Sequence, residues 1–190
     1  MISVFVPIKK YISSKDRLSS ILDESARAEL AEAMAKKTIA ALVDSQAFER
    51  IVVVTNDPTI FIEGAEIFVS ELNLNAALLE SVKSYEPDDR IMFIHADLPM
   101  INKDEINKLQ LAFKKGEVLI IPDIHGAGTN CLIFDSKQQF KLCFGPNSFN
   151  LFVSEFSSNG YAWSTYLSEP MQRDLDSEDD YFKLKDHLAK

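Results

Sequence analysis

Apolar runs of strand length recur along the chain and are mostly continuous, with few alternating polar positions. They are rich in Val, Ile and Phe, as expected of strands that are covered on both faces. Six runs predict strands, at residues 2–8, 51–55, 65–69, 91–95, 118–122 and 130–134.

Segments with apolar residues at helical spacing lie between these runs. The longest carries Leu30, Ala33, Met34 and Ala41 along one stripe. The predicted helices cover about residues 24–47, 73–84, 103–115, 147–159 and 178–188. Strands and helices that alternate in this way predict an α/β protein with a largely parallel sheet.

Two glycine-containing turns interrupt this alternation in the second half of the chain. Residues 125–129 enter a predicted strand, and residues 144–148 enter a predicted helix. We interpret the two turns as parts of an inserted region that faces the ligand-binding edge of the sheet.

Size and charge narrow the possible functions. A chain of 190 residues, 46% of them hydrophobic, can bury one sizeable core, which predicts a single domain over 1–190. The formal net charge of −9 argues against nucleic acid and anionic membranes as partners. No apolar run approaches the roughly 20 residues of a membrane helix. Since no targeting segment is visible either, we expect a cytoplasmic protein.

A basic loop follows the first predicted strand in this acidic chain. Four cations, Lys9, Lys10, Lys15 and Arg17, have only Asp16 as an acidic neighbour within the loop. Ligands of α/β sheets bind in the crevice outside the carboxyl ends of the strands. The loop is therefore a candidate phosphate-binding segment.

Asp97 follows the predicted strand 91–95 almost directly, and Pro99 prevents further strand pairing. A carboxylate at the tip of a buried strand, close to a basic loop, is well placed to hold Mg²⁺ on the phosphates of a nucleotide. The alternative is that Asp97 caps the next helix. Asn102 already offers that cap, so the metal role is favoured.

Asp174 and Asp176 form a second acidic element. Alternate residues of an extended chain point the same way, so both carboxylates could face one ion. Asp176 or Ser177 could equally cap the last predicted helix, whose first turn is acidic. Taken together with Asp97, the pair is a candidate second arm of the metal site.

The turn before the fourth predicted helix is a candidate anion site. The helix begins at about Asn147 or Ser148, and its free backbone N–H groups favour phosphate or carboxylate. Gly145 would allow close approach to the backbone, and Ser148 could add a hydroxyl donor. Ser148 as a plain N-cap is the equal alternative. The 125–130 turn is less specific.

Six segments in this order resemble the guanylyltransferases that build the deazaflavin coenzyme F-420. They are VPIKKYISSKDRL at 6–18, LNAAL at 74–78, ADLP at 96–99, GAGTN at 126–130, FGPNSF at 144–149 and DLD at 174–176. Each segment is short, but together they span nearly the whole chain.

The resemblance implies a Rossmann-like α/β/α sandwich of the nucleotide-diphospho-sugar transferase type, with a mixed, mostly parallel sheet. It implies transfer of GMP from GTP to a phosphorylated three-carbon acid, with release of pyrophosphate. The acceptor in this family is 2-phospho-L-lactate, phosphoenolpyruvate or 3-phospho-D-glycerate. Carried onto this chain, the acceptor site comprises Thr129, Gly145 and Ser148, and the metal site comprises Asp97, Asp174 and Asp176.

The resemblance also suggests a role for each basic residue. Lys15 and Arg17 would neutralise the triphosphate and the departing pyrophosphate, which makes them catalytic together with Asp97. Lys9 would bind the α-phosphate or orient the loop, and Asn75 would contact guanine or ribose. Mg²⁺ is the implied cofactor. The transferase that takes the guanylylated product is a further expected partner.

Two other functions stay open. A related nucleotidyltransferase for a sugar phosphate or the molybdenum cofactor would share the Asp97 site, but would not need the anion turn at 145–148. A nucleotide-binding regulator without catalysis would not need the intact acidic and basic residues. Release of pyrophosphate from GTP would separate a regulator from an enzyme.

Overall fold

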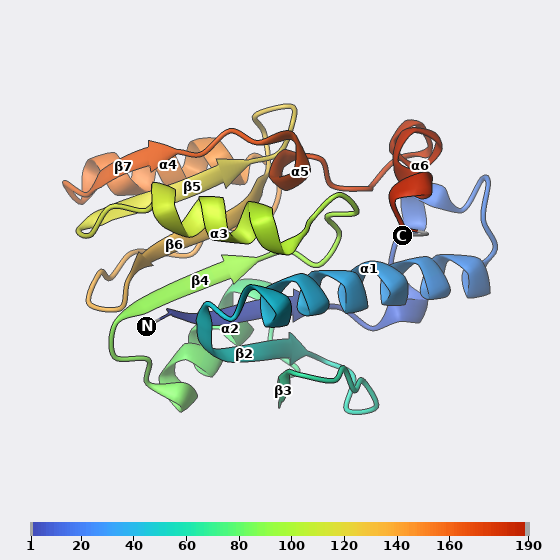
Figure 1. Ribbon diagram of the computed structural model, residues 1–190, viewed down its shortest axis with the longest axis horizontal. Coiled ribbons are helices and arrows are strands. Elements are labelled where there is room, and N and C mark those ends of the chain that lie inside the picture. Colours follow the sequence, from blue (N-terminus) through green and yellow to red (C-terminus); the bar gives the residue numbers. More distant parts are fainter. Residues whose placement is uncertain (1, 189–190) are drawn as a thin grey trace.

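A seven-stranded sheet forms the centre of the computed structural model, which describes residues 2–188 (Figure 1). Its strands lie in the order β3-β2-β1-β4-β6-β5-β7. In chain order they are β1 (Ile2–Ile8), β2 (Phe48–Thr55), β3 (Glu66–Val69), β4 (Arg90–Ile94), β5 (Glu117–Pro122), β6 (Thr129–Asp135) and β7 (Ala162–Thr165).

The sheet is mixed, as expected. Strands β3, β2, β1 and β4 pair in parallel, and β7 is parallel to β5, whereas β6 is antiparallel to both β4 and β5. Cys131, near the start of β6, pairs with Ile94 at the end of β4. The reversed strand therefore brings Thr129 to the edge where β1 and β4 end.

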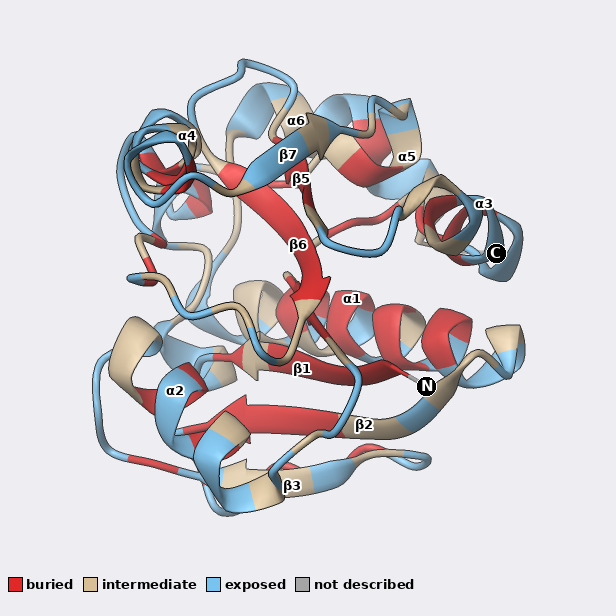
Figure 2. Ribbon diagram, turned by 90° about the vertical axis from the view of Figure 1, so that its left-hand side faces the viewer, coloured by how far each residue is buried: buried red, intermediate tan, exposed pale blue. Residues whose placement is uncertain are grey.

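Helices cover both faces of the sheet (Figures 1 and 2). Helices α1 (Glu24–Ser45) and α3 (Lys103–Ala112) lie on one face, and α2 (Leu74–Tyr85) and α4 (Ser148–Ser158) lie on the other. The buried residues gather on the strands and on the inward sides of these helices (Figure 2). This arrangement is the expected α/β/α sandwich.

The two faces are packed differently. The face under α1 and α3 is mainly aliphatic, with Ile39 and Ile106 fully buried against the sheet. The face under α2 and α4 is aromatic, and there Phe5, Phe93 and Phe152 are fully buried. Burial of a large apolar side chain is worth about 1.5–3 kcal/mol, so these two layers hold the helices on the sheet.

Two short elements were not predicted as such. Strand β7 is mostly exposed and pairs only at the edge of the sheet, and α5 (Glu169–Gln172) is a single turn. Neither is long or apolar enough to give a periodic pattern. Helix α6 (Glu178–Leu184) begins where expected but ends earlier, continuing as a 3₁₀ turn, Lys185–His187.

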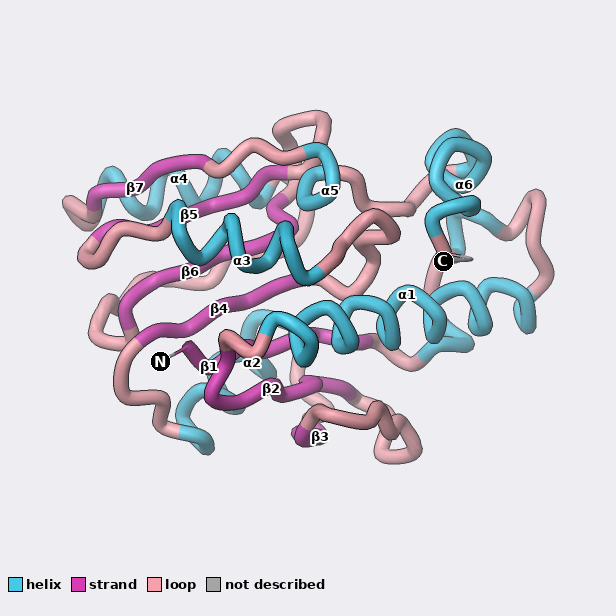
Figure 3. The backbone as a smooth tube through the Cα atoms, in the orientation of Figure 1, coloured by secondary structure: helices cyan, strands magenta, loops and turns pink. Residues whose placement is uncertain are grey.

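The chain returns to its own beginning through α6. Figure 3 shows α6 beside the segment that follows β1 and the start of α1. Leu175 and Leu184 pack there against Leu18, Leu30 and Met34. This small cluster brings the last acidic segment next to the basic loop. Among the described residues, no helix is both long and apolar enough to span a membrane.

Candidate active site

The acidic residues predicted from separate segments meet at the carboxyl edge of β4. Asp97, Asp174 and Asp176 each offer a carboxylate oxygen, and these oxygens lie within 4.8 Å of one another. The Oδ1 atom of Asp97 is buried and has no hydrogen-bond partner among the described residues. A buried acceptor without a donor, beside two more carboxylates, fits a hard divalent cation such as Mg²⁺.

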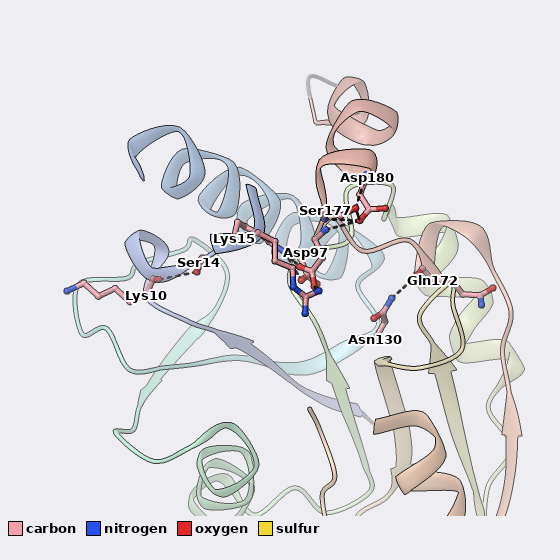
Figure 4. Close-up of polar contacts among 10 residues, drawn as sticks. Lys10, Ser14, Lys15, Asp97, Asn130, Gln172, Ser177 and Asp180 are labelled. Atoms are coloured by element: carbon pink, nitrogen blue, oxygen red, sulfur yellow. Dashed lines mark hydrogen bonds and ion pairs between the residues drawn. The ribbon is translucent and has the colours of Figure 1, made fainter. Parts of the chain in front are cut away.

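Lys15 lies inside this cluster (Figure 4). Its Nζ is 2.8 Å from Oδ2 of Asp97 and 2.7 Å from Oδ1 of Asp176. The loop before it forms a 3₁₀ turn, Tyr11–Ser13, and Lys15 itself is left-handed, with φ of 57°. The more exposed Arg17 reaches the same arm, with Nη1 3.7 Å from Oδ2 of Asp176.

The charged groups of the cluster shift one another's pKa values. Burial and the neighbouring charges of Asp97 and Asp176 raise the pKa of Asp174 to about 7. Burial alone would raise the pKa of Asp97, but the Lys15 ammonium holds it below the usual value. Burial alone would lower the pKa of Lys15. The Asp97 and Asp176 carboxylates have the larger effect, so the pKa lies above its usual value and the side chain stays charged.

The acidic arm is tied directly to the strand tip. The Leu175 N–H donates to the carbonyl of Asp97 at 3.0 Å, and the Leu175 side chain is fully buried. Because Leu175 points into the core, its two neighbours, Asp174 and Asp176, are turned the other way, toward Asp97. The burial of Leu175 therefore explains why the two aspartates that flank it face the same side.

Asn130 fixes the chain that leads into this arm. Its side-chain Nδ2 donates to the carbonyls of Met171 and Gln172, both at 3.1 Å (Figure 4). Its own carbonyl accepts from the N–H of His95 at 2.9 Å. One buried residue of β6 thus connects the end of β4 with the segment that carries Asp174.

A second anchor lies earlier in the same segment. The buried carboxylate of Glu105, on α3, accepts hydrogen bonds from the hydroxyls of Tyr166, at 2.8 Å, and Ser168. Burial favours the neutral acid, yet these bonds and Lys108 lower the pKa of Glu105. The charged carboxylate therefore holds the chain after β7 against α3.

Neither Asp97 nor Asp176 is the N-cap of a helix. Asn102 caps α3, accepting from Glu105 N, so Asp97 does not cap that helix. Ser177 caps α6 in a reciprocal box with Asp180 (Figure 4), so Asp176 is not the cap. Both acidic residues are therefore free of the roles that competed with metal binding.

The anion turn lies against the start of β6. Asn147, in a left-handed conformation, is the N-cap of α4, so Ser148 is the first helical residue and not the cap. The Ser148 hydroxyl lies 3.2 Å from the Thr129 hydroxyl, and both residues are buried. Gly145 has φ of 134°, a conformation that favours glycine, and a Cβ there would meet nothing within 4 Å.

The glycine turn before β6 is ordered by Asp123. Its carboxylate accepts from the N–H groups of His125, Ala127 and Gly128 at 3.1, 2.8 and 2.7 Å. A Cβ on Gly128 would lie 2.8 Å from Oδ2 of Asp123, so this position requires glycine. The Ala127 carbonyl in turn accepts from Phe149 N, which joins the two turns.

Asn75 has a different environment from the one expected. Both polar atoms of its side chain pair with the backbone of Phe144, each at 3.0 Å. A contact with guanine or ribose would therefore have to replace or share these bonds. Its nucleotide role stays a prediction.

Two adjoining cavities open at this edge of the sheet. One, of about 380 Å³, is polar and is lined by the basic loop with Lys9, Lys15 and Arg17, and by Asp97 and Asp176. The other, of about 360 Å³, is more apolar. Its lining includes Val54, Thr55, Asn56, Ser70, Leu72, Leu74 and Ala77. The end of β1 and His95 line both cavities.

A family model described as "Guanylyl transferase CofC like" matches residues 2–187. The chain belongs to this family. The chain is 32% identical over 180 residues to a phosphoenolpyruvate guanylyltransferase from Roseiflexus castenholzii, covering 92% of this chain and 83% of that protein. It is 29% identical to the 2-phospho-L-lactate guanylyltransferase of Methanothermobacter thermautotrophicus, covering 92% and 80%.

Solved structures agree with the fold. A nucleotidyl transferase from Methanothermobacter superposes with a TM-score of 0.68 at 16% identity, covering 100% of this chain and 98% of that one. The protein is thus a CofC-like guanylyltransferase with a nucleotidyltransferase fold. The resemblance seen in the six segments is confirmed, whereas the roles of the individual site residues stay predictions.

Three residues of the site region were not singled out from the sequence. Asn130 and Glu105 act through long-range hydrogen bonds that leave no local pattern. His95 lines both cavities, and its ring lies 5.5 Å from that of Phe144. Its place directly before Ala96 and Asp97 was the available signal.

Proposed function

We propose that this protein transfers GMP from GTP to a phosphorylated three-carbon acid, 2-phospho-L-lactate, phosphoenolpyruvate or 3-phospho-D-glycerate, in coenzyme F-420 biosynthesis. The observation that carries the proposal is the meeting of three carboxylates, a basic loop and the Thr129–Ser148 hydroxyl pair at one edge of the sheet. The names of the two relatives support phosphoenolpyruvate or 2-phospho-L-lactate as the first acceptors to test.

The two cavities suggest how GTP would lie. The apolar cavity suits a purine ring. The Thr55 hydroxyl and the Asn56 side-chain amide at its wall could each donate to the ring, because their oxygens only accept from backbone N–H groups. The polar cavity suits the triphosphate, because Lys9, Lys15 and Arg17 line it. The α-phosphate would then lie near the shared wall.

The acceptor would bind at the turn that precedes α4. The N-terminal end of α4, where the helix dipole favours an anion, and the Thr129 hydroxyl would hold the acid's carboxylate or phosphate. The N–H groups of Ser148 and Phe149 would have to share their protons with the acceptor, because they already donate to the carbonyls of Gly145 and Ala127. Ser148 would orient the Thr129 hydroxyl, since the two oxygens are within hydrogen-bond distance. The open space at Gly145 would allow the acceptor to approach the backbone.

The reaction requires no base from the protein. A phosphate monoester is mostly dianionic at neutral pH, because its second pKa is about 6. An acceptor phosphate oxygen forms a bond to the α-phosphorus of GTP. The bond between the α-phosphorus and the oxygen that bridges to the β-phosphorus breaks, and pyrophosphate leaves. Lys15 and Arg17 would neutralise the two polyanions and the departing pyrophosphate.

Asp97, with Asp174 or Asp176, would hold Mg²⁺. When bound, this ion would supply charge neutralisation and polarise the phosphoryl oxygens. We place the reaction in the cytoplasm, where GTP is available. The expected partner is the transferase that consumes the guanylylated product.

A pyrophosphate-release assay tests the proposal. We expect release with GTP and one of the three acids, little release with ATP, and none with GTP alone. Asp97→Asn should abolish transfer while the protein stays folded, because Mg²⁺ loses a charged ligand. Asp88→Asn, an exposed aspartate before β4, is the matched control. Near wild-type transfer by Asp97→Asn in saturating Mg²⁺ would rule out the metal role.

A further inference from the structure

Asn75 forms a two-point contact with a residue 69 positions away. Its Nδ2 donates to the carbonyl of Phe144 and its Oδ1 accepts from the N–H of Phe144, both at 3.0 Å. A neighbouring β-strand satisfies a residue in the same way, with one donor and one acceptor. The side chain of Asn75 therefore acts as a short strand partner for Phe144.

Phe144 is held by its ring as well. The ring is buried and lies 5.0 Å from that of Phe152 and 5.5 Å from that of His95. These contacts fix the position of the ring. The direction in which the backbone leaves Phe144, toward Gly145, is fixed by the backbone bonds to Asn75.

The opposite end of the turn has its own anchors. The Ser148 hydroxyl lies against Thr129, and Phe149 N donates to the carbonyl of Ala127. The turn 144–148 is thus tied to β6 at one end and to α2 at the other. Between these ends lies Gly145, whose backbone conformation is open to few other residues.

Helix α2 also forms part of the apolar cavity. Leu74 and Ala77, on either side of Asn75, line that cavity. The helix turn that would contact the nucleotide therefore carries the residue that holds the acceptor turn. The two halves of the site share one rigid element.

We propose that Asn75 is a positioning residue for the acceptor, which sets the turn 144–148 at a fixed distance from the nucleotide cavity. This inference rests on the proposed function, because it takes that turn as the acceptor site. It gives Asn75 a role on the acceptor side of the reaction, in place of a contact with guanine or ribose. Loss of the clamp should loosen the turn and weaken acceptor binding without weakening GTP binding.

The test compares Asn75→Ala with Asn75→Gln, which keeps both the donor and the acceptor. Asn159→Ala is the matched control, because Asn159 also donates to a backbone carbonyl, that of Glu155, at the far end of α4. Amide hydrogen exchange of residues 144–148 is measured without ligands. Steady-state kinetics with each of the three acids and calorimetry with GTP complete the comparison. If Asn75→Ala does not fold at the assay temperature, Asn75→Ser takes its place.

We expect two results for Asn75→Ala, because two hydrogen bonds are lost. The Phe144 amide should exchange about tenfold faster or more, and the KM for the acceptor should rise by about tenfold. The Kd for GTP and the kcat at saturating acceptor should not change. Asn75→Gln should recover part of the lost affinity, and Asn159→Ala should behave as wild type.

Three outcomes would overturn either the positioning role of Asn75 or the proposed function. A weaker GTP affinity with an unchanged acceptor KM would make Asn75 a nucleotide ligand and overturn the proposal. Unchanged exchange at Phe144 would also overturn it, since no clamp would then hold the turn. Wild-type protein without activity toward any of the three acids would overturn the proposed function, while the exchange rates would still decide whether the clamp exists.

Discussion

The Lys15 ammonium lies 2.8 Å from the Asp97 carboxylate, although 82 positions separate the two residues in the chain. A cation of the protein therefore neutralises an oxygen of the cluster that is proposed to hold Mg²⁺. The same ammonium also contacts Asp176, so it bridges the strand tip and the acidic arm. A divalent ion that uses these oxygens must compete with Lys15 or displace it.

Lys15→Met should therefore bind a divalent ion more tightly in the absence of nucleotide, because the competing charge is gone. Mn²⁺ affinity, measured by electron paramagnetic resonance, should rise by about tenfold, corresponding to roughly 1.4 kcal/mol of lost competition. Turnover should fall all the same, since Lys15 is proposed to neutralise the triphosphate. Lys10→Met, at an exposed lysine of the same loop, is the control. Weaker Mn²⁺ binding in Lys15→Met would mean that the lysine and the ion bind together.

Asn130→Ala should release the chain that leads to Asp174. Groups that hold metal ligands in place typically contribute about 10–100-fold to metal affinity, so Mn²⁺ binding should weaken by at least about tenfold. The carbonyls of Met171 and Gln172 would lose their donor, at a cost of about 1–3 kcal/mol in the free energy of unfolding. Asn107→Ala, an exposed asparagine on α3, controls for the substitution. Lower stability with unchanged Mn²⁺ affinity would limit Asn130 to a structural role.

Thr129→Val should weaken the acceptor and leave GTP binding unchanged. With Ser148 donating to Thr129, the Thr129 hydroxyl keeps its own proton for an anion. A hydrogen bond to a charged group is worth about 1.5–3 kcal/mol, so the acceptor KM should rise tenfold or more. Thr165→Val, at an exposed position of β7, is the matched control. Loss of GTP affinity at constant acceptor KM would instead assign this region to the nucleotide.

Glu105 should make stability depend on pH. Its pKa is lowered in the folded protein, so its contribution is fully present above the unfolded pKa, near 4.5, and is lost as the pH falls through the folded value. Glu105→Gln should lower the free energy of unfolding by about 1–3 kcal/mol at pH 7. The difference from wild type should shrink as the pH is lowered below 4.5. Urea unfolding across this range gives the measurement. A difference that stayed constant with pH would show that the Glu105 charge is not involved.

Local patterns determined much of this protein. Continuous apolar runs and helical spacing were enough for six strands and five helices, because each pattern lies within one segment. Asp97 at a strand tip and Asn102 as a helix cap also follow from adjacent residues. No pattern predicted the edge strand β7, because its four residues are mostly exposed and show no apolar period.

Only the tertiary structure decided which residues hold the site together. The reversed direction of β6 places Thr129 and Asn130 beside the end of β4, and strand direction has no signature in a short apolar run. Lys15 was expected to face phosphate, but its partners among the described residues are Asp97 and Asp176. The contact of Asn75 with Phe144 likewise joins residues 69 positions apart and has no local sequence pattern. Such bonds join positions far apart in the chain, so their geometry exists only once the sheet and its helices have packed.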